Sequence, residues 1–269
     1  MGTSNERMAN APIYYALVQV KFAPIAAMKK YVAEIQDALR VEGFPLFEAH
    51  ETPELRFEFK NPNEPPQPSF EQVTQWLMIN SERTSGFILG NDYITFHTTD
   101  YVTHEPFISS LMLGLNKVIE YAKPAFISRL GLRYLDAVIP HDDETVKQYL
   151  VNELHDVDFG LQQIQSIQEA VYRTSVEPLI QEGVMVARIH KMNTQLSFPP
   201  DMVPNGLIAL SQFRNTEQRW HAIIDTDHFV EGNMPIEPLK IEKQILSLHG
   251  KVKESFYKMV TDFAISKWK

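Results

Sequence analysis

The sequence predicts an α+β fold in which curved antiparallel sheets are backed by helices. Three observations lead to this prediction. The chain has 269 residues, of which 44% are hydrophobic, and this is enough to bury a sizeable core. Most segments alternate large or β-branched side chains, which is typical of strands. The order of the segments also repeats: residues 11–124 and 125–269 each predict one strand, one helix, four strands and one helix.

The first half opens with a predicted strand at 11–22, which is rich in aromatic and β-branched residues. An amphipathic helix follows at 26–41, because its apolar residues recur every three or four positions and Gly43 ends the run. The remaining expectations for this half are extended segments at 46–50 and 54–60, a proline-rich loop at 61–69, strands at 72–80, 85–90 and 92–101, and a helix at 105–122.

The second half begins with a predicted strand at 125–139 and a helix at 143–154. The last element is a helix at 237–264, in which the apolar residues form one stripe over about seven turns. The stripe consists of Ile241, Ile245, Leu248, Val252, Phe256, Val260 and Phe263. Between the two helices, strands are expected at 164–177, 184–192, 206–213 and 218–230.

Three segment pairs support an internal repeat: 16–24 with 131–139, 94–101 with 223–229, and 105–122 with 237–264. Each unit would form a sheet with one face covered by helices, and two units that join edge to edge remove two exposed edges. We therefore expect a short mobile tail at 1–10 and two similar halves that form either one domain or two. At the level of the fold, this arrangement resembles the TATA-binding protein and helix-grip domains.

Three short motifs are distributed along nearly the whole length of the chain. They are A-P-x-x-x-A-L-x-Q-V-[RK]-F at 11–22, G-L-R-Y-[LIV]-[DN] at 131–136, and a terminal helix with a Leu-His pair at 245–261, where Ile245 replaces the first leucine of the motif. In these motifs the chain resembles a sporadically distributed bacterial family of uncharacterised proteins of about this length. The resemblance implies no reaction, because no catalytic residues are established for that family.

The composition disfavours several classes of protein. There is no cysteine, so disulfides, thiolate nucleophiles and Cys-ligated metals are excluded. The formal net charge of −9 makes nucleic-acid binding an unfavoured alternative. Motifs for P-loop NTPases, Rossmann oxidoreductases, serine hydrolases and zinc proteases are absent from the sequence. Because the sequence has no signal-peptide pattern and no apolar run long enough to span a bilayer, we expect a cytoplasmic protein that does not enter membranes.

Asp225, Asp227 and His221 form the first candidate site. If 218–230 is a strand, these three side chains share one face and His228 lies on the other. Two carboxylates and an imidazole on one face can bind a divalent metal or act as a general acid–base pair. The three residues are therefore candidate catalytic residues and metal ligands, and the alternative is that they cap the turn after the strand.

His97, Arg133, Arg188 and His190 are candidate ligand-binding residues. Arg188 and His190 share one face of their strand and could receive an anionic group, or they form part of a solvated face. His97 lies on a face of Tyr and Thr residues that is also compatible with solvent. Arg133 lies within a central strand, where a guanidinium needs a carboxylate or a ligand, and we favour an internal ion pair between the halves. His249, at the edge of the apolar stripe, is expected to be a structural hydrogen-bonding group.

The absence of catalytic motifs favours a non-catalytic binding or protein-interaction protein. Its binding surface would be a concave sheet face, or a cavity between the sheet and the last helix, and its occupant a small apolar ligand or a protein partner. One alternative is a metal-assisted hydrolase that uses Asp225, Asp227 and His221. Another is a saddle-shaped sheet that binds nucleic acid. A homo-oligomer is compatible with each of these functions, and a divalent metal is the cofactor of the hydrolase alternative alone.

Overall fold

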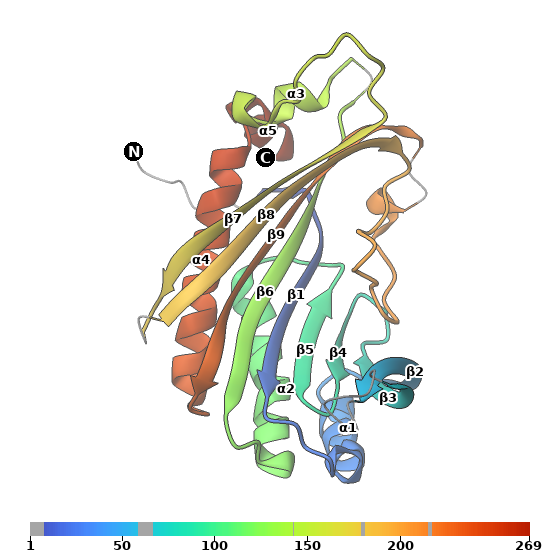
Figure 1. Cartoon of the computed structure of the whole chain (residues 1–269), viewed down its shortest axis with the longest axis vertical. Coiled ribbons are helices and arrows are strands. Elements are labelled where there is room, and N and C mark those ends of the chain that lie inside the picture. Colours follow the sequence, from blue (N-terminus) through green and yellow to red (C-terminus); the bar gives the residue numbers. More distant parts are fainter. Residues whose placement is uncertain (1–7, 59–66, 142, 179–180, 215–216) are drawn as a thin grey trace.

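In the part of the chain that the structure describes, the protein is built on one large curved antiparallel sheet of nine strands (Figure 1). The computed structural model describes residues 8–58, 67–141, 143–178, 181–214 and 217–269. The strand order is β2-β3-β4-β5-β1-β6-β9-β8-β7. The strands are β1 (Ile13–Phe22), β2 (Leu46–Glu58), β3 (Gln67–Ile79), β4 (Ser85–Leu89), β5 (Tyr93–Thr98), β6 (Ile127–Val138), β7 (Gln165–Val176), β8 (Gln181–Thr194) and β9 (Arg219–Met234).

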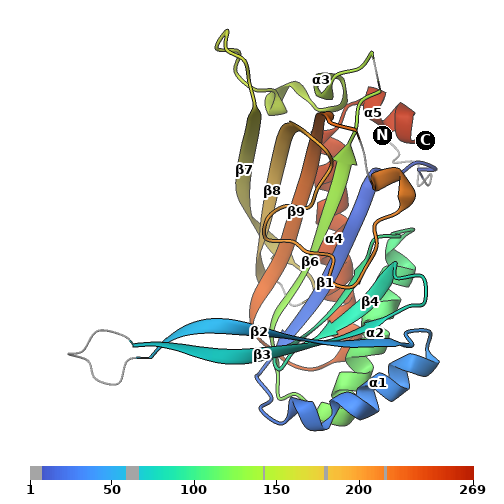
Figure 2. The same ribbon diagram turned by 90° about the vertical axis from the view of Figure 1, so that its right-hand side faces the viewer.

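Three helices cover one face of this sheet, and two short ones lie at one end of it (Figures 1 and 2). The covering helices are α1 (Val32–Val41), α2 (His104–Ala122) and α4 (Pro238–Met259), and the short ones are α3 (Val146–Tyr149) and α5 (Asp262–Trp268). The predicted α+β class, with a curved antiparallel sheet backed by helices, is therefore confirmed. No helix in the described part of the chain is long and apolar enough to cross a membrane.

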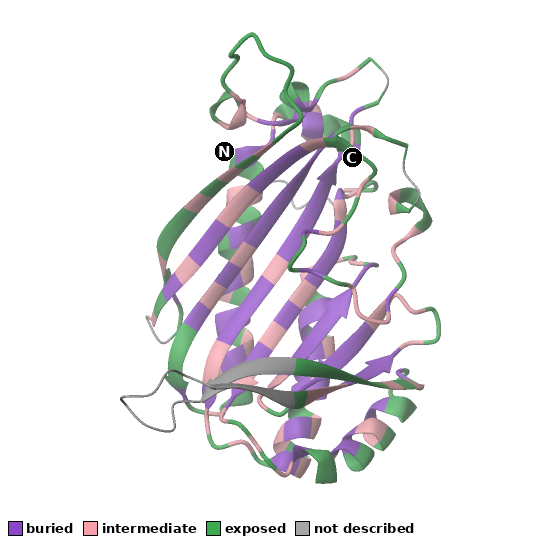
Figure 3. Ribbon diagram, turned by 45° about the vertical axis from the view of Figure 1, so that its right-hand side comes forward, coloured by how far each residue is buried: buried purple, intermediate pink, exposed green. Residues whose placement is uncertain are grey.

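The main core lies between the sheet and these helices. It joins buried side chains from both parts of the chain, such as Val20 and Leu111 from the first and Leu130 and Ile245 from the second. The apolar stripe of α4 packs against β6 and β9, as its spacing predicts. Burial on both faces explains why the central strands carry apolar side chains at nearly every position (Figure 3).

The other face of the sheet is partly covered by the connection between β8 and β9, and we call it the open face. In this connection, residues 195–218, Phe198, Met202 and Phe213 pack against Tyr14 and Tyr15 of β1. The β2–β3 hairpin extends away from the sheet on the side opposite the helices (Figure 2). The open face is therefore bordered by a long hairpin and by an irregular segment.

Segment 206–213 is not a strand, and this prediction was wrong. Only Ser211–Phe213 is regular, as a single 3-10 turn. Leu207 is buried against Leu77 and Ile79 of β3, and Thr99 donates a hydrogen bond to the carbonyl oxygen of Ile208 (2.7 Å). The apolar residues of this segment thus cover the sheet instead of joining it, so that three strands, not four, follow α3.

Several element boundaries also differ from the predictions. The expected extended segments 46–50 and 54–60 fall in one strand, β2, as far as Glu58. The loop expected at 61–69 ends earlier than predicted, because β3 begins at Gln67, and residues 59–66 lie outside the described residues. The expected helix 143–154 is reduced to α3 and a 3-10 turn at Asn152–Leu154. The last helix ends at Met259 because Val260 is extended and forms a bridge with Leu150, after which Thr261 caps α5.

Leu248 and Leu246 provide a test of the sheet–helix core. Leu248 is fully buried on α4, whereas Leu246 on the same helix is exposed. We expect Leu248→Ala to lower the free energy of unfolding by about 2–5 kcal/mol, because it leaves a cavity against the sheet. Leu246→Ala, with the same change in helix propensity, should alter it by about 0.5 kcal/mol or less. Urea unfolding followed by circular dichroism measures both, and equal effects would contradict this account of the core.

Candidate functional site

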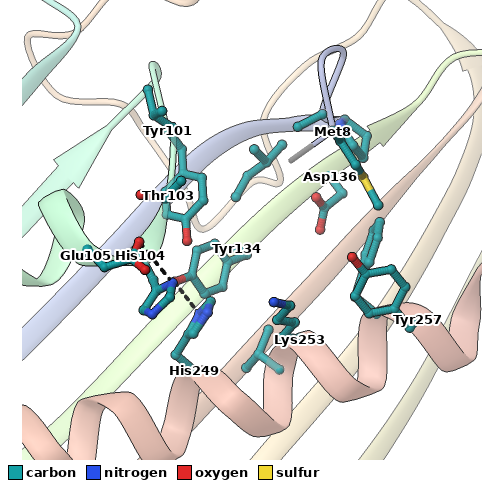
Figure 4. A pocket seen from close by; sticks show the side chains of 16 residues that line it. Met8, Tyr101, Thr103, His104, Glu105, Tyr134, Asp136, His249, Lys253 and Tyr257 are labelled. Atoms are coloured by element: carbon teal, nitrogen blue, oxygen red, sulfur yellow. Dashed lines mark hydrogen bonds and ion pairs between the residues drawn. The ribbon is translucent and has the colours of Figure 1, made fainter. Parts of the chain in front are cut away.

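A cavity of about 340 Å³ lies between the sheet and α4 (Figure 4). Four segments form its walls: the chain that leads into β1, the central strand β6, the chain that leads into α2 with its first residues, and the C-terminal half of α4. Its deeper part is lined by Tyr134, Asp136 and Val252, which are buried. Its rim carries polar and charged side chains that reach solvent, including His104, Glu105, Lys253 and Tyr257. The cavity is therefore amphipathic, with a buried floor and a polar rim.

Asp136 places a carboxyl group in the floor of this cavity. On β6 it follows Leu130, Leu132 and Tyr134 on the face toward the helices, where the other positions are apolar or aromatic. The side chain is only 8% exposed, and it makes no hydrogen bond or ion pair with any described residue. Burial raises the pKa of Asp136 to about 7. Such a group is costly to the fold and is available to a ligand.

His249 lies on α4 in the wall of the same cavity and belongs to an aromatic cluster. Its Nδ1 lies 3.1 Å from the Tyr134 hydroxyl, and its ring stacks on that of His104 with 4.5 Å between centroids. Burial, followed by the charges of His104 and Lys253, lowers the pKa of His249 to about 4. The expected structural hydrogen bond from His249 to a neighbouring strand is thus confirmed. The neutral imidazole can exchange hydrogen bonds with a ligand through Nε2.

Asp225 and the candidate residues around it lie on the open face of the sheet, which is opposite the face that lines the cavity. Arg133 on β6 donates two hydrogen bonds to the Asp225 carboxylate, of 2.7 and 2.6 Å, and also contacts Asp201 at 2.6 Å. Asp225 is fully buried, and Arg188 and His190 approach it at 3.7 and 3.8 Å. The sequence prediction of an internal ion pair for Arg133 is confirmed, but both carboxylates come from the second half of the chain.

The pKa values of Asp225 and Asp227, the two neighbouring carboxylates of β9, are shifted in opposite directions. Burial raises the pKa of Asp225, but the His190 imidazole and the Arg133 guanidinium reverse this effect and hold it below its usual value. Burial also raises the pKa of Asp227, and the more distant Arg129, at 3.5 Å, only partly opposes it. Both carboxylates therefore face arginines, which is the usual arrangement for internal ion pairs.

His221 and His97, two candidate histidines of the open face, contact different groups. His221 shares the face of Asp225, as predicted, and its Nδ1 lies 3.1 Å from the carbonyl oxygen of Arg219. His97 on β5 contacts the Tyr15 hydroxyl at 3.0 Å, and burial lowers its pKa to about 3. Within the described ranges, no three His, Asp or Glu side chains are grouped as metal ligands. The structure thus joins Arg133, Arg188 and His190 around Asp225, and leaves His97 apart from them.

Sequence reasoning missed the principal residue of the cavity. It singled out Arg133 of the central strand but assigned no role to Asp136, three positions later. The signal was present, because a carboxylate interrupts an alternating row of buried apolar positions on this strand. Tyr101, His104 and Lys253 come from other elements, and only the fold brings them to Asp136 (Figure 4).

No protein-family model and no curated protein sequence matches the chain. Function is therefore inferred from geometry.

The buried carboxyl group predicts a distinct pH dependence of stability. The pKa of Asp136 is higher in the folded state than in an unfolded chain. The contribution of its protonated carboxyl to the free energy of unfolding is therefore fully present below about pH 4 and is lost as the pH rises through 7. We expect Asp136→Asn to match the wild type near pH 4 and to be more stable at pH 8, by as much as about 4 kcal/mol. Urea unfolding across this range tests it, and parallel profiles would show that the carboxyl is not desolvated.

The Arg133–Asp225 pair predicts a large energetic coupling. Arg133→Met leaves a fully buried carboxylate without its main partner, so the free energy of unfolding should fall by about 3–5 kcal/mol. Adding Asp225→Asn should recover part of this loss because it removes the uncompensated charge. As a matched control, Arg40→Met breaks an exposed pair with Asp37 and should cost less than about 1 kcal/mol. A small effect of Arg133→Met would contradict the structural role.

Proposed function

We propose that the chain is a non-catalytic binding protein whose cavity between the sheet and α4 holds a small amphipathic ligand. The observation that carries this proposal is the buried carboxyl group of Asp136 at the cavity floor, which has no hydrogen-bond or ion-pair partner among the described residues. A desolvated carboxyl lowers stability unless something compensates it, and a ligand that donates a hydrogen bond to it provides that compensation.

The size and the lining of the cavity suit a small organic molecule. Its volume of about 340 Å³ lies within the usual range for ligand pockets, which are mainly apolar with a few convergent polar groups. Tyr101, Tyr134, Phe256 and Tyr257 supply aromatic surface around Asp136 (Figure 4). We infer a ligand with an apolar body and a donor group, such as an amine or a hydroxyl, that reaches Asp136.

The remaining features favour binding over catalysis. Asp225 and Asp227, the carboxylates that a metal-assisted hydrolase would use, face Arg133 and Arg129 on the sheet face opposite the cavity. His249, the histidine of the cavity, is engaged with Tyr134 and stacked on His104. These contacts leave the Asp136 carboxyl as the ionisable group at the cavity floor. A single such group is sufficient to recognise a ligand but does not form a set of catalytic residues.

The topology supports a more specific version of the fold, which we propose as a duplicated unit of the helix-grip or TATA-binding-protein type. In each part of the chain the first strand pairs with the last, β1 with β5 and β6 with β9. The first strands of the two parts lie side by side at the centre of the sheet. Each part then ends in a covering helix, α2 or α4. The second part has one strand fewer, so the repeat would be imperfect.

Native mass spectrometry tests the proposed function. The gently purified protein should carry a non-covalent mass that disappears on denaturation. Asp136→Asn should weaken binding of the identified molecule about tenfold or more, because it removes a charge-assisted hydrogen bond. Ala11→Trp, which fills the cavity from the chain before β1, should abolish binding.

A matched control for the filling variant is Val41→Trp, which adds the same side chain at an exposed position of α1. This variant should retain the ligand mass. The proposal fails if the native spectrum shows bare protein only and a screen of small amines and alcohols gives no binding. It also fails if a bound mass is retained undiminished in Ala11→Trp, since the ligand then occupies another site.

A further inference from the structure

The two outer edges of the sheet differ sharply in their chemistry. The β2 edge, LFEAHETPELRFE, contains Pro53 and four glutamates, the features that normally prevent edge-to-edge association. The β7 edge, QSIQEAVYRTSV, contains no proline and only two charged residues, Glu169 and Arg173. β7 is twelve residues long, and among the described residues it pairs on one side only, with β8. An unprotected edge of this length invites pairing with another strand.

Apolar side chains are exposed along this edge. Ile167 and Val171 are each 62% exposed, and Tyr172 is 51% exposed. The segment that leads into β7 adds Val157, Phe159, Leu161 and Ile164, which are all exposed. Figure 3 shows the contrast between the buried central strands and this exposed outermost strand. In the described part of the chain, no backbone hydrogen bond joins the outer side of β7 to another segment.

We propose that two copies of the chain associate through antiparallel pairing of their β7 strands about a two-fold axis at Val171. This proposal is independent of the cavity and of any ligand. The two nine-stranded sheets would then continue into one another across the interface. Antiparallel pairing of one strand with its own copy satisfies the two-fold symmetry of a closed dimer and removes both exposed edges at once.

Charge complementarity selects a second copy as the occupant. With the axis at Val171, Glu169 lies opposite Arg173 of the partner subunit, and the symmetric pair forms on the other side of the axis. Within one chain Glu169 already contacts Arg188 at 2.6 Å, and Arg173 contacts Glu182 at 3.2 Å. Pairing would join these contacts into a row of alternating charges across the interface, which is favourable for cross-strand neighbours.

The same charges disfavour other registers. An axis at Glu169 places two glutamates opposite one another, and an axis at Arg173 places two arginines opposite one another. Both arrangements are destabilising. An axis one residue away from Val171 opposes the charged residues with uncharged ones and loses the two ion pairs. The strand sequence therefore encodes one preferred alignment with itself.

Sedimentation equilibrium of the full chain tests the dimer. The wild type should sediment as a dimer of about 62 kDa, which is twice the chain mass of 31.0 kDa. Arg173→Glu and Glu169→Lys each place like charges opposite one another, so each variant alone should dissociate with an apparent Kd at least about tenfold higher. An equimolar mixture of the two variants should regain the dimer, because each cross-strand pair in the heterodimer is again of opposite charge.

Two further variants keep the result interpretable. Val171→Lys places two like charges at the axis and should also give monomers, without touching the contacts of Glu169 with β8. Glu34→Lys on α1 makes the same charge change at an exposed position and should remain dimeric. Circular dichroism confirms that each variant is folded. A monomeric wild type at all concentrations, a dimer that survives Val171→Lys, or a variant mixture that stays monomeric would each overturn the proposal.

Discussion

The antiparallel pairing of β1 with β6 is the interaction on which the rest of this structure depends. It joins the strands that begin the two parts of the chain, from the contact of Ile13 with Asp136 to that of Phe22 with Ile127. Because both strands lie at the centre of a nine-stranded sheet, each of their faces must be covered. The helices cover one face, and the β8–β9 connection covers part of the other. The cavity exists where α4, α2 and the chain before β1 do not close completely over β6.

The two faces of β6 show two treatments of buried charge. On the open face, Arg133 is matched by carboxylates, and its bidentate contact with Asp225 offsets the cost of burying both groups. On the helix face, Asp136 has no such partner within the described ranges of the chain, and the energetic cost of its charge is retained in the folded protein. A paired buried charge costs the fold far less than an unpaired one, and an unpaired carboxyl in a cavity is the kind of exception that function explains. This contrast is why the proposed function rests on Asp136.

The fold class could be predicted from the sequence because it depends on periodicity. The apolar and β-branched runs of β1, β6 and β9 and the stripe on α4 follow directly from which faces are buried. The error at 206–213 has a physical cause, because a short apolar run can either pair within a sheet or lie over it, and its composition is the same in both cases. The predicted last helix breaks at Val260 because this residue forms a bridge with Leu150. The two residues are over a hundred positions apart, so the local sequence pattern does not predict this contact.

The cavity was harder to predict than the sheet, because its walls come from four separate segments. Selective carbon-13 labelling of aspartate and NMR titration of the Asp136 carboxyl measures the central claim most directly. The account predicts that Asp136 in the ligand-free protein titrates near pH 7. Titration of Asp136 near pH 4, the ordinary range of an aspartate, would show a hydrated or paired carboxyl and would contradict the proposed ligand site.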